Sequence, residues 1–293
     1  MFVVMCVVWG IPYLMIRVAV RDVSPATLVL ARTALAAGLL LPIAAARREL
    51  RPVLSRWAPL LAFAAVEIAV PWYLLGSAEK RLSSSLTALL IAAIPLVATV
   101  IARTTGERER VDARGALGLA LGTVGVAAIV GLNLEGASAS SVIEIAGVVL
   151  CYATGPVILQ RTLADRPALG VIALSLAVSA VAYVPIAAFT LPSEMPSAEA
   201  SASIAALAIV CTAFAFLVFF ALIAEVGPRR AMVFTYVNPA VAAIAGVAVL
   251  DEAFTTGMGI GFVLVLVGSL LATRPARATA ADLADLEPAF KSV

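Results

Sequence analysis

Two ionisable side chains lie deep inside apolar stretches of the sequence. Glu67 is in AFAAVEIAVPW, and Arg32 is in SPATLVLARTALAAGLLLP. If these stretches cross a bilayer, an uncompensated charge near their centre costs at least about 2.5 kcal/mol. Each side chain must then be neutral, paired or facing water, and such residues are typical of substrate pathways and proton relays. We interpret Glu67 and Arg32 as candidate binding residues for a small molecule.

Aromatic and amide side chains on other apolar stretches add groups that suit a pocket. Trp9 and Tyr13 are four residues apart, Tyr152 lies four residues before a proline, and Tyr236 is near Asn238. We include these five residues in the predicted site, although aromatic residues also serve as lipid-belt or core residues. Two aromatic residues close to the end of a stretch are expected to be interface anchors: Trp72 and Tyr73.

Prolines inside the apolar stretches remove helical hydrogen bonds. Pro71 follows Glu67 by four residues, so the Glu67 carbonyl loses its expected partner. Unpaired backbone at membrane depth is tolerated where it is satisfied by other groups or lines a cavity. The alternative is a kink that only shapes packing. We predict five hinge or kink positions: Pro12, Pro71, Pro95, Pro156 and Pro239.

The composition excludes several classes of function. The chain is 63% hydrophobic and 13% charged, with a mean hydropathy of +1.09, whereas a soluble domain has about 25% charged residues. It has no histidine, which removes the commonest general base and metal ligand. Its three cysteines match neither a metal site nor a disulfide framework. We expect no catalytic residue, metal or cofactor and, with a net charge of +2, no nucleic-acid partner.

Apolar runs of about 20 residues predict membrane-spanning helices. The sequence contains ten such runs, joined by short loops, so we predict an all-α membrane protein. The predicted spans are 2–20, 25–45, 57–76, 82–102, 114–132, 142–162, 168–190, 203–224, 230–250 and 257–273.

The second half of the chain repeats the first at a shift of 143 to 145 residues. Pro95 corresponds to Pro239, and Glu107 to Glu252. The repeat predicts units at 1–134 and 135–273, followed by a disordered cytoplasmic tail at 274–293. Glu107, Asp251 and Glu252 are expected to cap the helix that follows each of them. Two further sets of glycines suit close helix contact: Gly115, Gly118, Gly122 and Gly125, and Gly257, Gly259, Gly261 and Gly268.

The repeat also bears on the roles of Arg32 and Glu67. Their helices are expected to be adjacent, so an alternative to a binding role is a buried ion pair that joins the two helices. The second half has leucine opposite Arg32 and Cys211 opposite Glu67. Because one half folds without these charges, we favour a functional role.

Basic residues predict the orientation of the chain. With alternating loops, fifteen arginines and lysines fall on one side and four on the other. The positive-inside rule then places both termini in the cytoplasm. Because each unit has five spans, the two units enter from opposite faces. We therefore predict two inverted five-helix repeats, with Glu107 cytoplasmic and Glu252 outside.

Several motifs resemble the EamA-type branch of the drug/metabolite transporter superfamily. The opening WGIPY, the arginine-bearing second span, the segment LLGSAEKRLSSSLTALLIAAIPL and the closing VGPRRA…NP…DE…G are similar to that family's pattern. The closing Asp-Glu differs from the family's usual Gly-Glu. The resemblance implies ten helices in two inverted halves and transport of a small organic metabolite across the lipid bilayer.

We therefore predict a secondary transporter, an exporter of an amino-acid-like or amphipathic solute, that works by alternating access. A site with both Arg32 and Glu67 suits a zwitterion, and a mutually neutralised pair suits a neutral or aromatic solute. Proton coupling through Glu67 is a hypothesis. The alternatives are a passive facilitator or channel, a structural membrane protein and, more distantly, a membrane enzyme. The 18 arginines against 2 lysines favour a bacterial inner membrane; the oligomeric state is left open.

Overall fold

The computed structural model describes residues 1–104, 113–131, 138–227 and 231–273. These residues are helical, with no strand among them. Seven helices are long and apolar enough to cross a membrane: Phe2–Ala19, Pro25–Ala46, Trp57–Glu79, Ser84–Ala102, Ala139–Thr162, Ala168–Ala188 and Ala198–Val226. The other three predicted spans correspond to apolar helices of 10–17 residues, at Ala113–Ile129, Asn238–Leu250 and Thr256–Ala272. Length and composition therefore support seven of the ten predicted crossings.

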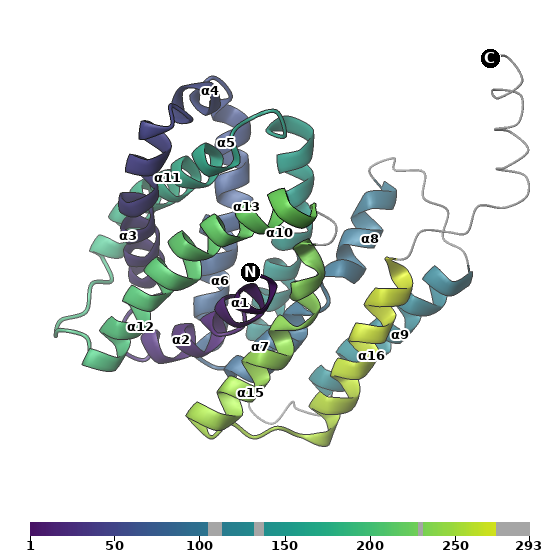
Figure 1. Cartoon of the computed structure of the whole chain (residues 1–293). Helices are drawn as coiled ribbons and strands as arrows, with labels where there is room; N and C mark the ends of the chain where they lie inside the picture. Colours follow the sequence, from purple (N-terminus) through teal and green to yellow (C-terminus); the bar gives the residue numbers. More distant parts are fainter. Residues whose placement is uncertain (105–112, 132–137, 228–230, 274–293) are drawn as a thin grey trace, which may run out of the picture.

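Several crossings consist of more than one helical piece (Figure 1). In chain order the elements are α1 Phe2–Val8, α2 Pro12–Ala19, α3 Pro25–Ala46, α4 Leu50–Leu54, α5 Trp57–Phe63, the π-helix η1 Ala64–Ala69, α6 Val70–Glu79, α7 Ser84–Ile91, α8 Ile94–Thr104, α9 Ala113–Gly131, α10 Ala139–Thr162, α11 Ala168–Ala188, α12 Ala198–Ala208, the π-helix η2 Ile209–Phe214, α13 Ala215–Val226, the 3₁₀ helix η3 Met232–Tyr236, α15 Asn238–Leu250 and α16 Thr256–Ala272.

Hydroxyl side chains begin five of these helices. In each case the side-chain oxygen accepts a hydrogen bond from a backbone N–H in the first turn, which satisfies a donor that the helix itself cannot. Proline often follows such a cap because it fits the first helical position, as in the Ser24–Pro25 start of α3. The capping residues are Ser24, Ser83, Ser138, Ser197 and Thr255.

The arrangement of the helices reflects the sequence repeat. The π-helices η1 and η2 start 145 residues apart, at Ala64 and Ile209. The main helix contacts are α2 with α12, α6 with α10, α3 with α11, α7 with α15, and α9 with α16. When each helical piece is counted with the whole crossing that contains it, exchanging the two repeats converts the first two contacts into each other and maps each of the others onto itself. This is the pseudo-two-fold symmetry of a two-repeat fold.

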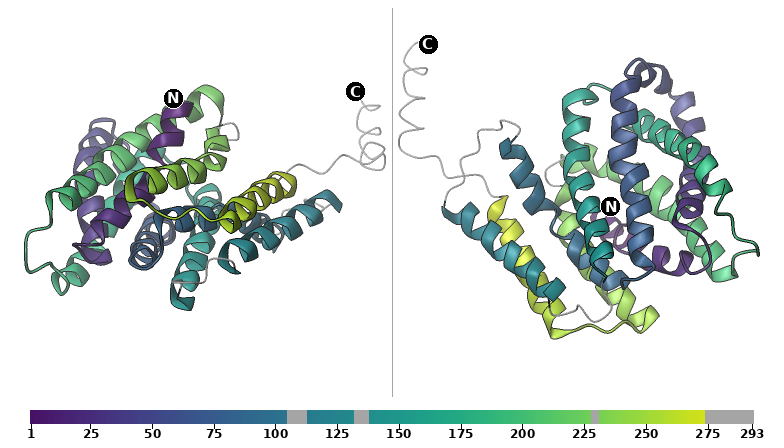
Figure 2. Two further views of the ribbon diagram at one scale, coloured as in Figure 1. Left: turned by 90° about the horizontal axis from the view of Figure 1, so that it is seen from below. Right: turned by 180° about the vertical axis from the view of Figure 1, so that it is seen from behind.

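Glycines let α9 and α16 approach closely, beside the larger bundle (Figures 1 and 2). A Cβ added at Gly118 would lie 2.6 Å from the Ala272 nitrogen and 2.7 Å from the Gly268 carbonyl oxygen. A Cβ at Gly125 would lie 2.7 Å from the Gly261 carbonyl oxygen. These contacts confirm that the two predicted glycine faces meet.

The predicted role of the acidic residues is wrong in one respect. Glu252 does not cap the following helix, α16, which is capped by Thr255. Its carboxylate instead accepts hydrogen bonds from the backbone N–H groups of Ser84 (2.7 Å) and Ser85 (2.9 Å), at the start of α7, and from both hydroxyls. The acid therefore joins the end of α15 to a helix of the other repeat. Glu107 and the tail at 274–293 lie outside the described residues.

Candidate functional site

Arg32 is buried in the middle of α3, where residues from both repeats surround it. Its guanidinium carbon lies 3.6 Å from the centre of the Trp72 ring on α6, which is a cation–π contact. Its Nε donates a hydrogen bond to the Thr212 hydroxyl in η2 (2.9 Å), and that hydroxyl donates to the Leu207 carbonyl (2.8 Å). The cation is thus held by an aromatic face and a hydroxyl.

One prediction about this region is wrong, and one alternative is excluded. Trp72 is not an interface anchor, since only 7% of it is exposed and Arg32 covers its ring. Arg32 and Glu67 do not form an ion pair. The ion pairs between described residues are Arg81–Glu144 and Arg166–Asp165. No carboxylate of the described residues is therefore bonded to the Arg32 guanidinium.

Two of the predicted tyrosines accompany Arg32. Tyr13 on α2 and Tyr152 on α10 lie within electrostatic range of its guanidinium. Tyr152 packs against both large hydrophobic clusters of the molecule, so it lies where they meet. The structure thus brings together a cation and three aromatic rings, from helices of both repeats.

Glu67 lies in η1 and faces α10. A Cβ at Gly155 of α10 would overlap the Glu67 Oε2 atom, so the carboxyl group occupies the space that this glycine leaves free. The Oε2 atom is buried without a hydrogen-bond partner in the described residues. Tyr152 lies within electrostatic range of Glu67. Glu67 therefore points at a helix of the other repeat.

The π-helices are a feature that the sequence predictions missed. π-Helical turns leave carbonyl groups without regular partners and are frequent at functional sites. The Trp9 indole N–H donates to the Cys211 carbonyl in η2 (3.2 Å), and the Tyr183 hydroxyl donates to the Ala69 carbonyl at the end of η1 (2.9 Å). Pro71 follows η1, but phenylalanine occupies the corresponding position after η2. A search for prolines in the sequence therefore locates only one of the two π-helices.

Trp9 lies in an aromatic cluster of its own. Its ring centre is 5.6 Å from that of Phe216, 5.0 Å from that of Phe219 and 5.3 Å from that of Phe234. The cluster packs α1 against α13 and η3. The indole N–H reaches η2, the same π-helix that holds Thr212 beside Arg32.

Tyr236 and Asn238 occupy different surroundings. The Tyr236 hydroxyl is 3.3 Å from the Thr273 hydroxyl, at the end of α16. With its amide oriented to donate, the Asn238 nitrogen lies 3.0 Å from the Phe234 carbonyl oxygen and 3.1 Å from that of Cys6. This amide joins α1 to η3, and neither residue is among the groups that contact Arg32.

The five prolines act differently in the helices. Pro12 begins α2 after a break that follows α1, Pro95 lies at the start of α8, and Pro239 begins α15 after η3. Pro71 follows η1 at the start of α6. Pro156 lies inside α10, which is continuous.

The described surface has hollows away from the predicted binding residues. One, of 470 Å³, is lined by Ala45, Arg48, Leu50 and Arg51. Another, of 440 Å³, is lined by Leu61, Ala177, Val178, Val181 and Ala182. The predicted binding residues line neither hollow.

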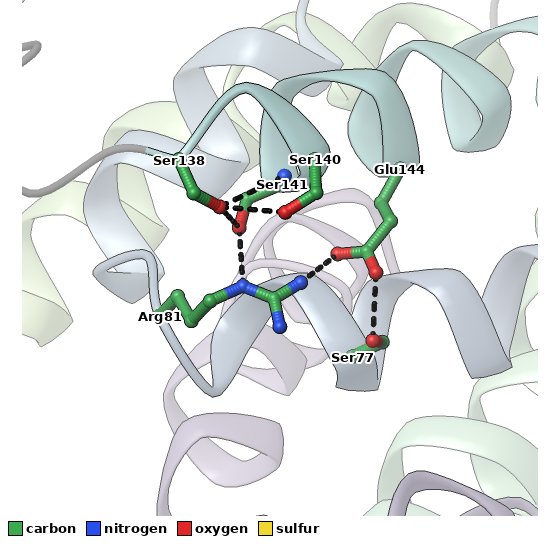
Figure 3. Close-up of polar contacts among 6 residues, drawn as sticks. All are labelled: Ser77, Arg81, Ser138, Ser140, Ser141 and Glu144. Atoms are coloured by element: carbon green, nitrogen blue, oxygen red, sulfur yellow. Dashed lines mark hydrogen bonds and ion pairs between the residues drawn. The ribbon is translucent and has the colours of Figure 1, made fainter.

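Polar contacts between the repeats gather at one end of the bundle, which we call the Glu252 end. It comprises the segments 20–24, 77–85, 138–144, 190–197 and 251–255. Arg81 donates to Glu144 (2.7 Å) and to the Ser141 hydroxyl (2.7 Å), and Ser77 donates to Glu144 (2.8 Å; Figure 3). Further contacts of this kind are Asp22 with the Ser197 N–H (2.8 Å), Ser24 with Thr190 (2.7 Å), and Glu252 with Ser84 and Ser85.

The opposite end, which we call the Arg51 end, comprises 47–56, 163–170 and 273. There Glu49 accepts a hydrogen bond from the Gly170 N–H (3.2 Å), which also joins the two repeats. Several polar contacts between the repeats therefore close the Glu252 end over its described residues.

Glu79 is a buried acid that the sequence predictions overlooked. It is the last residue of α6, directly before Lys80 and Arg81, so it resembles a loop residue in the sequence. Its exposed fraction is 0%, and neither carboxyl oxygen has a hydrogen-bond partner in the described residues. Its carbonyl oxygen accepts a hydrogen bond from the Arg17 guanidinium.

Repeated apolar helices, π-helical turns and a buried cation between the repeats define a multi-span membrane protein of two-repeat architecture. The model of the EamA-like transporter family matches residues 1–131 and 139–274. The chain belongs to this family, a branch of the drug/metabolite transporter superfamily, which confirms the predicted resemblance and a transporter of small solutes.

Comparison with other proteins adds the fold alone. No curated protein matches the chain. A solved structure described only as the crystal structure of a protein is 18% identical, with a TM-score of 0.66, over 93% of this chain and 94% of that one. At this identity the likeness supports the shared fold and carries no information about the solute.

Proposed function

We propose that the protein is a secondary transporter that exports a small amino-acid-like or amphipathic metabolite by alternating access. The observation that carries this proposal is the position of Arg32. Its guanidinium is buried among residues of both repeats, and no described carboxylate bonds to it. Substrate sites of repeat-built transporters lie between the repeats. A carboxylate on the solute is the complementary charge, and the Trp72, Tyr13 and Tyr152 rings suit its apolar part.

The proposed arrangement has ten crossings in two inverted units, 1–134 and 135–273. Both termini are cytoplasmic, in a bacterial inner membrane, and the Glu252 end faces outside. The contacts at the Glu252 end support alternating access, because a network of polar bonds between the repeats closes that end. In this account the structure represents a state closed to the outside.

Proton coupling through Glu67 is part of the proposal. Its Oε2 atom is buried without a partner and contacts α10 of the other repeat. Because an ionised carboxylate without a partner is costly to bury, a proton on Glu67 stabilises this contact. Relative movement of the repeats exposes the carboxyl group and releases the proton.

Binding to Arg32 is tested by thermal unfolding of the purified protein with a panel of amino acids, polyamines and common drugs. A ligand at 100 times its Kd stabilises by about 2.7 kcal/mol, which raises Tm by several degrees. We expect a carboxylate-bearing member to raise the Tm of the wild type and of Arg56→Gln, a control at an exposed arginine. Arg32→Gln should abolish the shift. A shift that persists in Arg32→Gln would contradict this site.

A further inference from the structure

Glu79 is enclosed near the Glu252 end, and no described group bonds to its carboxyl oxygens. Its exposed fraction is 0%, and both carboxyl oxygens lack a hydrogen-bond partner in the described part of the chain. The adjacent Lys80 and Arg81 are exposed. The chain at the end of α6 thus buries its acidic side chain and exposes the two basic side chains that follow.

The charged groups around Glu79 bind atoms other than its carboxyl oxygens. The Arg17 guanidinium, from α2, donates to the Glu79 carbonyl oxygen, and Arg32, from α3, is held by Trp72 and Thr212. Glu252 binds the start of α7, and Glu144, on α10, is paired with Arg81. Tyr13 on α2 also lies within electrostatic range of Glu79. Glu252 carries a like charge, which disfavours an ionised Glu79 further.

A carboxylate in this position is not stable as an anion. Burying an isolated ionised carboxylate is far costlier than burying a neutral polar group, so such groups are neutralised instead. We infer that Glu79 is a proton-binding site that must be occupied for the Glu252 end to close. This inference rests on the proposed alternation between open and closed ends.

When the Glu252 end opens, the Glu79 carboxyl group is no longer enclosed. The bonds Asp22–Ser197, Arg81–Glu144 and Glu252–Ser84 separate, and water reaches the end of α6. The carboxyl group then releases its proton to water and becomes an anion beside the Arg17 guanidinium. Closing takes the proton up again. Linkage to one proton changes the closed-to-open ratio by up to about tenfold per pH unit.

Other groups at this end do not account for such a response between pH 5 and 9. The whole chain has no histidine, the side chain that ordinarily titrates in this range. Hydrogen bonds from the Ser197 side chain and backbone lower the pKa of Asp22, whose ordinary value is about 3.9. Asp22 therefore stays ionised throughout the range, and its contact with Ser197 is lost only as the pH falls through the lowered pKa.

The test is a distance measurement across the Glu252 end as a function of pH. Spin labels are attached to Arg21→Cys and Glu194→Cys, both exposed positions, in the full chain with its three native cysteines replaced by alanine. Without any solute, we expect the short-distance population to fall as pH rises from 5 to 9. Glu79→Gln, a neutral mimic of the protonated acid, should stay closed at every pH.

Glu199→Gln is the matched control, because it neutralises an exposed carboxyl group close to the same end and should keep the pH response. Glu79→Met, also neutral and of similar length, replaces Glu79→Gln if that variant does not fold. An unchanged pH response in the Glu79 variants, or a wild type that does not respond, overturns the inference. Failure of the proposed transport function would be seen in a different measurement. Solute exchange would then be absent, whether or not the label distance changes with pH.

Discussion

At the scale of single residues, the shape of the Arg32 contact matters as much as its charge. The guanidinium stacks on Trp72 and donates through Nε to Thr212. Lysine supplies a compact ammonium group without a planar face or an equivalent donor. A conservative substitution therefore tests geometry separately from charge.

We predict that Arg32→Lys weakens binding of the ligand found in the thermal screen by roughly 5- to 30-fold. This corresponds to a loss of about 1–2 kcal/mol from a desolvated cation–π contact and its hydrogen bond. Titration calorimetry on the wild type and on Arg56→Lys provides the comparison. Equal affinity in Arg32→Lys would show that charge alone is sufficient.

Glu67 is tested by a substitution on the facing helix. We expect Gly155→Ala to displace the Glu67 carboxyl group, because the new Cβ would overlap Oε2. Solute accumulation driven by a pH gradient in proteoliposomes should fall to the level of Glu67→Gln, while exchange without a gradient persists. Gly38→Ala is the control, since nothing lies within 4 Å of its Cβ position. Full gradient-driven accumulation in Gly155→Ala would contradict the proposed coupling.

Sequence analysis predicted part of the residue-scale site. Glu67, Arg32, Tyr13 and Tyr152 were found because charge and aromaticity in apolar runs are visible in a sequence. Trp72 was misjudged and Glu79 was overlooked, because distance from a helix end does not show which face a side chain occupies. Tyr236 contacts Thr273, and Asn238 contacts Phe234 and Cys6, partners that no sequence pattern indicated.

At the scale of elements, a helix boundary could be predicted where the local sequence contains a clear start signal. The predicted span 25–45 agrees with α3, because Ser24 and Pro25 are a strong start signal. The predicted span 230–250 is shorter as an α-helix, since η3 precedes Asn238. The second π-helix has no proline after it, so no local signal marks it. It becomes predictable only by aligning the repeats.

The contact between α9 and α16 gives a prediction at this scale. Gly118→Ala places a methyl group against backbone atoms of Gly268 and Ala272, which cannot rotate away. We expect a destabilisation of about 1–3 kcal/mol from overpacking, seen as a Tm lower by roughly 2–4 °C per kcal/mol. Gly38→Ala should leave Tm unchanged or raise it, because alanine favours a helix. Equal Tm values for the two variants would contradict the close packing.

At the scale of the whole molecule, the repeat links sequence to mechanism. The near-constant shift between Pro95 and Pro239 predicted two units, and the symmetric helix contacts agree with it. The sequence could not show which end is closed, because closure depends on contacts between distant segments such as Asp22 with Ser197.

The network in Figure 3 gives a prediction about this closure. Glu144→Gln weakens the Arg81 ion pair and should reduce the closed population of the Glu252 end. The pair is partly exposed, at 41% and 20%, so we expect a loss of about 1 kcal/mol or less, a change of roughly fivefold at most. The Arg21–Glu194 label distance reports it, with Asp165→Asn as the control at the Arg51 end. An unchanged label distance in Glu144→Gln would show that this ion pair does not contribute to closure of the Glu252 end.

Solute counterflow tests alternating access most directly. Proteoliposomes are loaded with the strongest ligand of the thermal screen and diluted into a trace of the labelled form. We predict a transient accumulation of label above the external concentration, absent in Arg32→Gln, because a carrier exchanges one bound solute for another. Simple equilibration without an overshoot in the wild type would indicate an open pore and contradict the account.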